Sequence, residues 1–138
     1  MTIIKTDMSE LSKLEPRSVW EQFEAITKVP RPSKNEGKIR EFLEDFATRH
    51  SLDCRTDKIG NVLITRPAAP SMKQRPTVVL QSHMDMVCEK NSGVEFDFDN
   101  DPIQVYIGEG WVKARGTTLG ADDGIGMAAA LAILIDEN

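Results

Sequence analysis

The stretch VVLQSHMDMV, residues 78–87, runs apolar, presents a histidine and an aspartate two positions apart, and turns apolar again. A short continuous apolar run such as Thr77 to Gln81 is typical of a β-strand that is covered on both faces. Because residues i and i+2 face the same side of a strand, His83 and Asp85 are expected to point the same way. Ligand sites gather at the carboxyl ends of sheet strands, so this pair is a candidate site.

The pair His83 and Asp85 suits metal chemistry. One imidazole nitrogen can bind a metal while the other donates a hydrogen bond to a carboxylate that fixes the ring. By itself, however, the pattern H-x-D is weak. A histidine that caps a strand and is satisfied by a nearby aspartate is the more ordinary interpretation, so a second group of donors is needed.

The stretch GTTLGADDGIGMAAA, residues 116–130, supplies a second group. Asp122 and Asp123 precede an apolar helix, and acids are stabilised near a helix N-terminus, so capping is one interpretation. A cap needs only one acid, and it does not need the surrounding glycines, which are Gly116, Gly120, Gly124 and Gly126. So many glycines indicate an unusual backbone path that places a carboxylate accurately. A carboxylate held in this way can bridge two divalent ions.

A competing motif overlaps the same stretch. Residues Gly124 to Ala129 match G-x-G-x-x-A, which is the dinucleotide-binding fingerprint. That fingerprint follows a strand directly, whereas a long loop precedes it here. Asp122 and Asp123 would also repel a pyrophosphate. A nucleotide-binding domain is therefore the least favoured interpretation.

The remaining patterns predict an α/β domain. Apolar residues at helical spacing predict helices from Ser18 and from Ser33 to about Arg49, each opening on a capping box with Glu21 or Glu36. The further expected elements are strands over 52–56 and 62–64, a hairpin of strands over 103–107 and 111–114, and a buried helix from Gly124 to about Asp136. This order favours a mixed sheet flanked by helices.

Composition excludes several classes of function. The chain has 138 residues, enough for one domain with a core. Its net charge is -5 and its Lys and Arg are scattered among acids, which argues against nucleic-acid and membrane partners. Cys54 and Cys88 form no metal-binding frame and are expected to be reduced thiols. With no signal peptide or membrane-spanning run in the sequence, the cytoplasm is the expected location.

Together the motifs resemble the co-catalytic zinc peptidases of the aminoacylase and carboxypeptidase G type. The finer resemblance is to the aminoacyl-histidine dipeptidases, also called Xaa-His or cytosolic non-specific dipeptidases. It covers about Leu14 to Leu134 and includes the phrases VWEQFEAITKVPRPSKNEGKIREFL, DKIGNVLI, VVLQSHMDMVCEK and TTLGADDGIGMAAALAIL. The Asp-Asp-Gly at 122–124, in place of the Asp-Lys-Gly of general members, is similar to this subgroup.

The resemblance implies a role for each site residue. His83 is expected to bind one zinc ion, Asp85 to steer that histidine as a catalytic residue, and Asp122 to bridge two ions. The bond between Asp122 and Asp123 is expected to be cis. Manganese and cobalt suit comparable donors. The implied activity is hydrolysis of small peptides, Xaa-His dipeptides above all, by a metal-activated water.

The resemblance also implies that residues 1–138 are the N-terminal portion of a catalytic domain. The family supplies a Glu-Glu pair, further ligands and a lid-like dimerisation domain later in sequence. We therefore expect the chain alone to be inactive and to self-associate as a homo-oligomer through apolar surface at Thr77 to Gln81 and on the last helix. The alternative is a non-catalytic metal-binding or interaction module that keeps half a site. The other histidine, His50, is expected at the surface.

Overall fold

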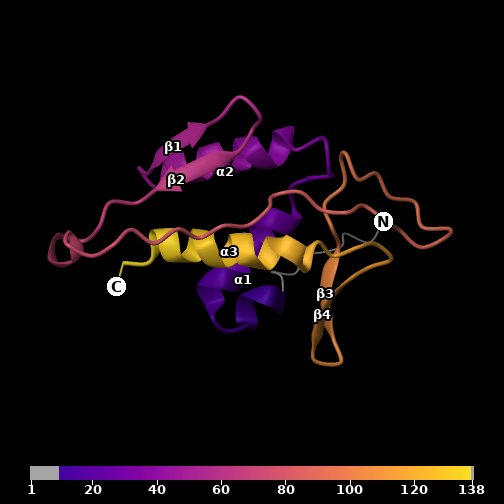
Figure 1. Ribbon diagram of the computed structural model, residues 1–138. Coiled ribbons are helices and arrows are strands. Elements are labelled where there is room, and N and C mark those ends of the chain that lie inside the picture. The colour runs from indigo at the N-terminus through magenta and orange to yellow at the C-terminus, as the bar shows by residue number, and fades with distance from the viewer. Residues whose placement is uncertain (1–9, 138) are drawn as a thin grey trace.

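The computed structural model describes residues 10–137, in which two α-helices are followed by two pairs of short strands and a last α-helix (Figure 1). The order is η1 (Glu10–Lys13), α1 (Arg17–Thr27), α2 (Gly37–Arg49), β1 (Asp53–Thr56), β2 (Val62–Thr65), η2 (Pro70–Met72), β3 (Val105–Gly108), β4 (Trp111–Ala114) and α3 (Ala121–Ile135). The expected α/β class is confirmed. The three α-helices and four strands match predicted elements, whereas the strand expected at Thr77 to Gln81 is absent and the short helices η1 and η2 were not predicted.

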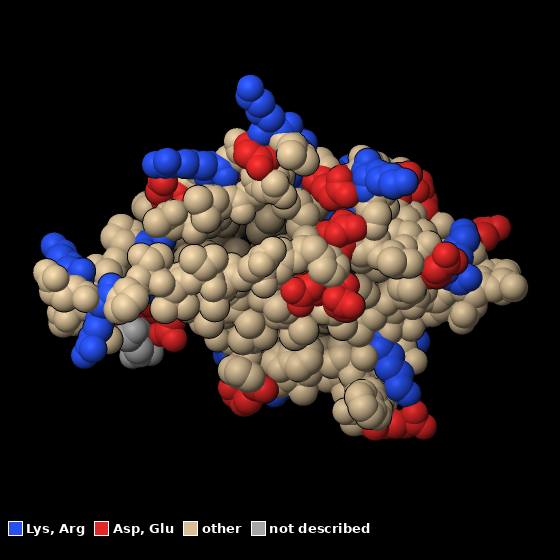
Figure 2. Space-filling view, viewed as in Figure 1, with Lys and Arg blue, Asp and Glu red and all other residues tan. Residues whose placement is uncertain are grey.

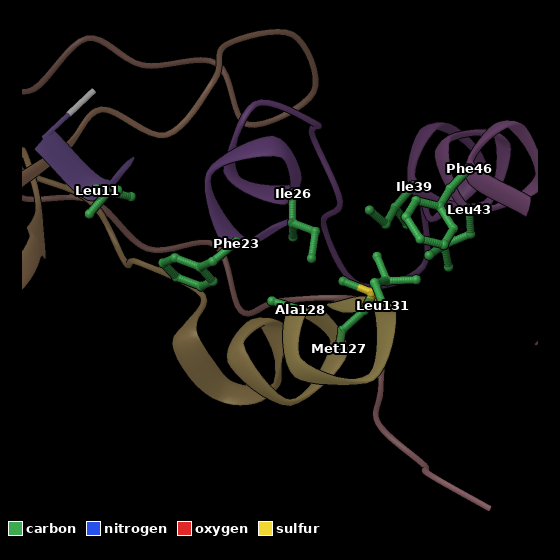
Figure 3. Packing of buried hydrophobic residues seen from close by; sticks show 9 residues of the cluster. All are labelled: Leu11, Phe23, Ile26, Ile39, Leu43, Phe46, Met127, Ala128 and Leu131. Atoms are coloured by element: carbon green, nitrogen blue, oxygen red, sulfur yellow. The ribbon is translucent and has the colours of Figure 1, made fainter. Parts of the chain in front are cut away.

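The apolar faces of the three α-helices form the core (Figure 3). Its members are Leu11, Phe23 and Ile26 of the first part of the chain, Ile39, Leu43 and Phe46 of α2, and Met127, Ala128 and Leu131 of α3. Burying one large apolar side chain stabilises the fold by about 1.5–3 kcal/mol. The core therefore fixes α3, and with it the loop that precedes α3, against α1 and α2.

The strands form two separate antiparallel pairs in the described part of the chain, and not one mixed sheet. Strands β1 and β2 pair with Asp53 opposite Thr65, around a turn that contains Gly60 and Asn61. Strands β3 and β4 form the expected hairpin, with Gly108 opposite Trp111. The single mixed sheet that the sequence predicts is thus not formed in residues 10–137, and helices with two small sheets are consistent with an α/β fragment.

Both predicted capping boxes are wrong. Helix α1 begins at Arg17 after Pro16, and α2 begins at Gly37, four positions after Ser33; neither has a side-chain cap. Glu21 pairs instead with Arg17 at 2.7 Å. The hydroxyl of Ser33 is directed to Asp85, a residue far along the chain, so it is not available to a helix end.

The apolar run at Thr77 to Gln81 is not a strand in this structure, and Figure 1 draws it without an arrow. Val78 and Val79 are 79% and 78% exposed. The prediction of a covered strand was wrong for this chain, since the run finds no pairing partner among residues 10–137. The expected exposure of apolar surface here is confirmed, and on α3 it extends to Ile133, which is 57% exposed.

Charged side chains are interspersed over the molecular surface. On the face drawn in Figure 2, Lys and Arg lie mainly at the rim, whereas Asp and Glu lie both at the rim and in the middle of the face, among uncharged residues. Within residues 10–137, no helix is both long enough and apolar enough to cross a bilayer. Cys54 and Cys88 are both free thiols, as expected.

Candidate metal centre

Three chain segments meet at the predicted site. The connection between α1 and α2 lies against the segment after His83, because the Met86 amide donates to the Arg31 carbonyl at 3.0 Å and the Ser33 amide donates to Met86 at 3.3 Å. The loop before α3 joins them through Thr118, whose hydroxyl donates to the Val87 carbonyl at 2.7 Å. This backbone pairing brings together residues that are far apart in sequence.

The side chains of His83 and Asp122 converge as predicted. The Nε2 atom of His83 lies 3.0 Å from Oδ1 of Asp122, and its Nδ1 atom lies 3.1 Å from Oδ1 of Asp85. The Ser33 hydroxyl donates to the other Asp85 oxygen at 2.5 Å. The imidazole of His83 thus lies between two carboxylates, and the carboxylate of Asp85 also accepts a hydrogen bond from Ser33.

These hydrogen bonds shift the ionisation of the site. The hydrogen bond with Asp122 raises the pKa of His83, and the Asp85 carboxylate adds to this effect. The Ser33 hydroxyl lowers the pKa of Asp85, and the hydrogen bond with His83 acts in the same direction. At neutral pH, Asp85 is therefore an anion that can fix the orientation of the ring.

The pair is not explained by stability. The side chains of His83 and Asp122 are 51% and 98% exposed. Ion pairs between exposed side chains typically contribute only about 0–1 kcal/mol. The contacts among this imidazole and its two carboxylates therefore contribute little to stability. Their arrangement is better explained by a function.

The donor atoms fit a divalent cation. In a tetrahedral zinc site, a nitrogen and an oxygen ligand each about 2.0–2.2 Å from the metal are about 3.3–3.6 Å apart. His83 Nε2 and Asp122 Oδ1, which lie 3.0 Å apart, would need to move apart only slightly to reach that geometry. Within residues 10–137 no group of three or more His, Cys, Asp or Glu side chains is arranged to hold a metal. The described part of the chain therefore offers a pair of donors.

The other candidate donors lie apart from this pair. His50 is the C-cap residue of α2 and is exposed, as expected; its ring contacts that of Phe46 at a tilt of 47°, with centroids 4.6 Å apart. The thiol of Cys88 points to the Met86 carbonyl at 3.6 Å. Burial raises the pKa of the Cys88 thiol, so it is neutral in the metal-free chain.

The backbone around Asp122 agrees with the resemblance. The peptide bond between Asp122 and Asp123 is cis, as expected. Both residues have non-helical backbone angles although they lie within α3, whose N-cap is Gly120 with φ 70°. The N-cap residue Gly120 makes no side-chain cap, while both aspartates lie in the first turn of α3, where the helix dipole favours acids.

The glycines of the competing nucleotide motif serve close packing. A Cβ atom on Gly124 would lie 2.6 Å from Nη2 of Arg31, and one on Gly126 would collide with the Asp123 carboxylate. Both glycines lie inside α3, and the turn that precedes them follows a loop from β4. Their role in packing accounts for them without a nucleotide.

Two cavities lie side by side at the site. The first, about 430 Å³, is lined by His83, Asp85, Thr118, Gly120 and Asp122 among others. The second, about 410 Å³, is apolar, and Trp20, Trp111 and Ile125 contribute to it. Leu119 and Ala121 line both. The candidate donors thus face a hollow that has an apolar neighbour.

Sequence reasoning missed two residues of the site. Ser33 was assigned to a helix cap, and Arg31 attracted no interpretation. Arg31 is only 2% exposed and its guanidinium reaches the backbone on both sides of the site. The pattern of an arginine between two prolines predicts an exposed loop. The role of Arg31 becomes visible only in the structure, where this charged side chain is buried.

Comparison with known proteins agrees with the resemblance. The chain is 51% identical over 131 residues to the cytosol non-specific dipeptidase of Escherichia coli (strain K12), which covers 95% of this chain. It superposes on the aminoacylhistidine dipeptidase of Vibrio alginolyticus with a TM-score of 0.91 at 47% identity, again over 95% of this chain. A tripeptidase from Staphylococcus aureus has a TM-score of 0.69 at 22% identity, which supports the fold alone.

The chain spans 27% of the length of each of the first two relatives. No family model matches the sequence. The identity nevertheless extends over nearly all of this chain, and the backbone agrees with the solved relative over the same share. The resemblance to the aminoacyl-histidine dipeptidases that the sequence motifs predict is thus confirmed.

Proposed function

We propose that this chain forms the N-terminal part of the catalytic domain of a metal-dependent dipeptidase that hydrolyses dipeptides, with the Xaa-His type favoured. The observation that carries the proposal is the 3.0 Å approach of His83 Nε2 to Asp122 Oδ1, with Asp85 behind the ring. The names of the two relatives support the reaction class. The cytosolic name of one relative supports a cytoplasmic location.

His83 and Asp122 are the residues that would hold zinc, and manganese or cobalt would suit the same donors. When bound, such a metal supplies a Lewis acid that polarises a peptide carbonyl and lowers the pKa of water. His83 must be neutral to bind, so its raised pKa makes binding depend on pH. Asp122 offers a carboxylate with a second oxygen free for a further ion.

Asp85 acts on the imidazole of His83. Its anionic oxygen accepts a hydrogen bond from Nδ1, which leaves Nε2 as the free donor atom for a metal. Ser33 holds the Asp85 carboxylate from the other side. The Ser33 hydroxyl therefore orients the Asp85 carboxylate, and this carboxylate orients the imidazole of His83.

A chimera tests the proposal. The matching 27% of the Escherichia coli dipeptidase is replaced by this chain, and hydrolysis of an Xaa-His dipeptide is measured with zinc. The chimera should be active. His83→Ala and Asp122→Ala should each abolish most turnover, and Asp85→Asn should lower it by about 10–100-fold. His50→Ala, which removes the other histidine, should leave turnover unchanged. Activity that survives His83→Ala would contradict the proposal.

The alternative is a metal-binding module without catalysis. A tetrahedral zinc ion takes four donors, and His83 with Asp122 supplies two of them, which favours the module for the 138-residue chain on its own. We expect this chain with added zinc to leave an Xaa-His dipeptide intact. A chimera that folds and binds zinc but shows no turnover would favour the module for the longer protein as well.

A further inference from the structure

We propose that Arg31 is a positioning residue that joins the two halves of the metal centre, a role that rests on the proposed function of that centre. Its Nη1 donates to the carbonyls of Met84 and Asp85 at 3.1 and 2.9 Å. Its Nη2 donates to the carbonyl of Gly120 at 2.5 Å. One guanidinium thus connects the segment that carries His83 to the loop that carries Asp122.

The burial of Arg31 indicates a specific role. The residue is 2% exposed and is the largest fully buried side chain among residues 10–137. Taking a guanidinium out of water is costly unless its donors are satisfied. Arg31 makes no ion pair within 4 Å in the described residues, although the charge of Asp85 acts on it, and its Nε atom has no hydrogen-bond partner there. Its satisfied donors all reach main-chain carbonyls of the site.

The site carries glycines where the guanidinium lies. A Cβ atom on Gly120 would be 2.5 Å from Nη2 of Arg31, and one on Gly124 would be 2.6 Å from the same atom. Any larger residue at either position would displace the guanidinium. Part of the glycine pattern before α3 is therefore explained by the arginine that packs against it.

The planar fork of arginine suits this task. Its donors point in fixed directions, so they can hold three carbonyls from two chain segments at once, whereas a lysine ammonium is a single point on a flexible stem. The guanidinium touches neither His83 Nε2 nor Asp122 Oδ1. It acts by fixing the backbone from which these atoms project.

The first test needs no metal. In the 138-residue chain, NMR measures the nuclear Overhauser effect between the ring protons of His83 and the β protons of Asp122. Arg31→Met fills similar space without donors and should weaken this effect strongly, while Arg31→Lys should restore it only in part. Arg66→Met is the matched control, because Arg66 also donates to main-chain carbonyls, those of Ile133 and Asp136, at the other end of α3.

The second test measures zinc binding by competition with a chromogenic chelator. Arg31→Met should weaken binding by about 10–100-fold, the range seen when groups that orient metal ligands are removed. Arg66→Met should bind as the wild type does. Gly124→Ala keeps the arginine but displaces it, so it should weaken binding too. The double variant should be no worse than Arg31→Met, because both changes remove the same contact.

The outcomes separate the two proposals. Wild-type proximity of His83 and Asp122 together with wild-type zinc affinity in both Arg31→Met and Gly124→Ala would overturn the role of Arg31. An equal loss in Arg66→Met would also overturn it, since the effect would then be general destabilisation. A wild-type chain that binds no zinc, but loses the contact in Arg31→Met, would leave the positioning role intact and contradict metal binding by His83 and Asp122 in this chain; the chimera then tests the metal function of the longer protein.

Discussion

At the scale of single residues, the two carboxylates around His83 make its protonation informative. Imidazolium can donate to both Asp85 and Asp122, so the folded-state pKa of His83 is raised, with the Asp122 hydrogen bond as the largest cause. The resulting stabilisation is fully present below the unfolded-state pKa and is lost as pH rises through the folded-state pKa. Metal binding shows the opposite dependence, because it requires the neutral ring.

We therefore expect His83 to titrate above its ordinary range in the metal-free chain and Asp122→Asn to lower the midpoint. NMR of the His83 ring protons measures the midpoint in the wild type and in Asp122→Asn. Zinc affinity should fall as the pH drops below the midpoint of His83. An identical midpoint in Asp122→Asn would show that the two side chains do not meet in solution.

Ser33 allows a second test of a single contact. Ser33→Ala removes the hydroxyl that donates to Asp85, so the pKa of Asp85 should rise and the hold on the His83 ring should loosen. We expect zinc binding to weaken by about 10-fold. Ser18→Ala is the matched control, because Ser18 was also predicted to cap a helix and is an exposed residue in α1 without a capping bond. Equal zinc binding in both variants would remove Ser33 from the site.

At the scale of elements, helices and hairpins follow from local patterns, but their ends do not. The spacing of Phe23 and Ile26 and of Ile39 and Leu43 predicts the buried faces of α1 and α2. The predicted start of α2 failed because Ser33 is engaged by Asp85, a contact between residues 52 positions apart. A local motif cannot reveal that a distant residue competes for the same hydroxyl.

The turn between β1 and β2 gives a prediction for pH. Asp57 accepts hydrogen bonds from the Asn61 side chain and from the amides of Ile59, Gly60 and Asn61, and these lower its pKa. Because the folded-state pKa is depressed, the stabilisation is present above the unfolded-state pKa and is lost as pH falls through the folded-state value.

Asp57→Ala should therefore lower the melting temperature at pH 7, and the difference from the wild type should shrink as the pH falls below about 4. Thermal unfolding followed by circular dichroism measures both. Asp53→Ala is the control, since Asp53 makes only an exposed ion pair with Arg55 at 3.3 Å and should change the melting temperature little. A difference that stays constant down to pH 2 would rule out the carboxylate as its cause.

At the scale of the whole molecule, the sequence predicts the approach of His83 and Asp122 but not the arrangement of the strands. His83 and Asp122 meet because the apolar faces of α1 and α2 pack with the largely apolar α3 and fix the loops between them. The run at Thr77 to Gln81 has the composition of a covered strand, yet a strand forms only where a partner backbone lies beside it. The composition of Thr77 to Gln81 indicates that these residues favour burial. It does not specify whether residues 10–137 contain a strand that can pair with them.

Because this apolar run stays exposed, we expect the chain to self-associate. Val78, Val79 and Leu80 are 79%, 78% and 51% exposed in consecutive positions, and contiguous apolar surface of this kind drives association in water. Light scattering should give the 138-residue chain a mass above that of the monomer, rising with concentration. Val79→Lys should shift the mass towards the monomer, because a charge in such a run opposes both burial and pairing of edges.

Ile59 provides the matched control for this charge. It is 88% exposed in the turn between β1 and β2, as an isolated apolar side chain, so Ile59→Lys adds the same charge without touching the run. Its mass should follow that of the wild type. If Ile59→Lys and Val79→Lys reduce the mass equally, net charge and not the run controls association. A wild-type mass that stays monomeric at the highest concentration would mean that three exposed aliphatic residues in sequence are too small a surface to hold two copies together.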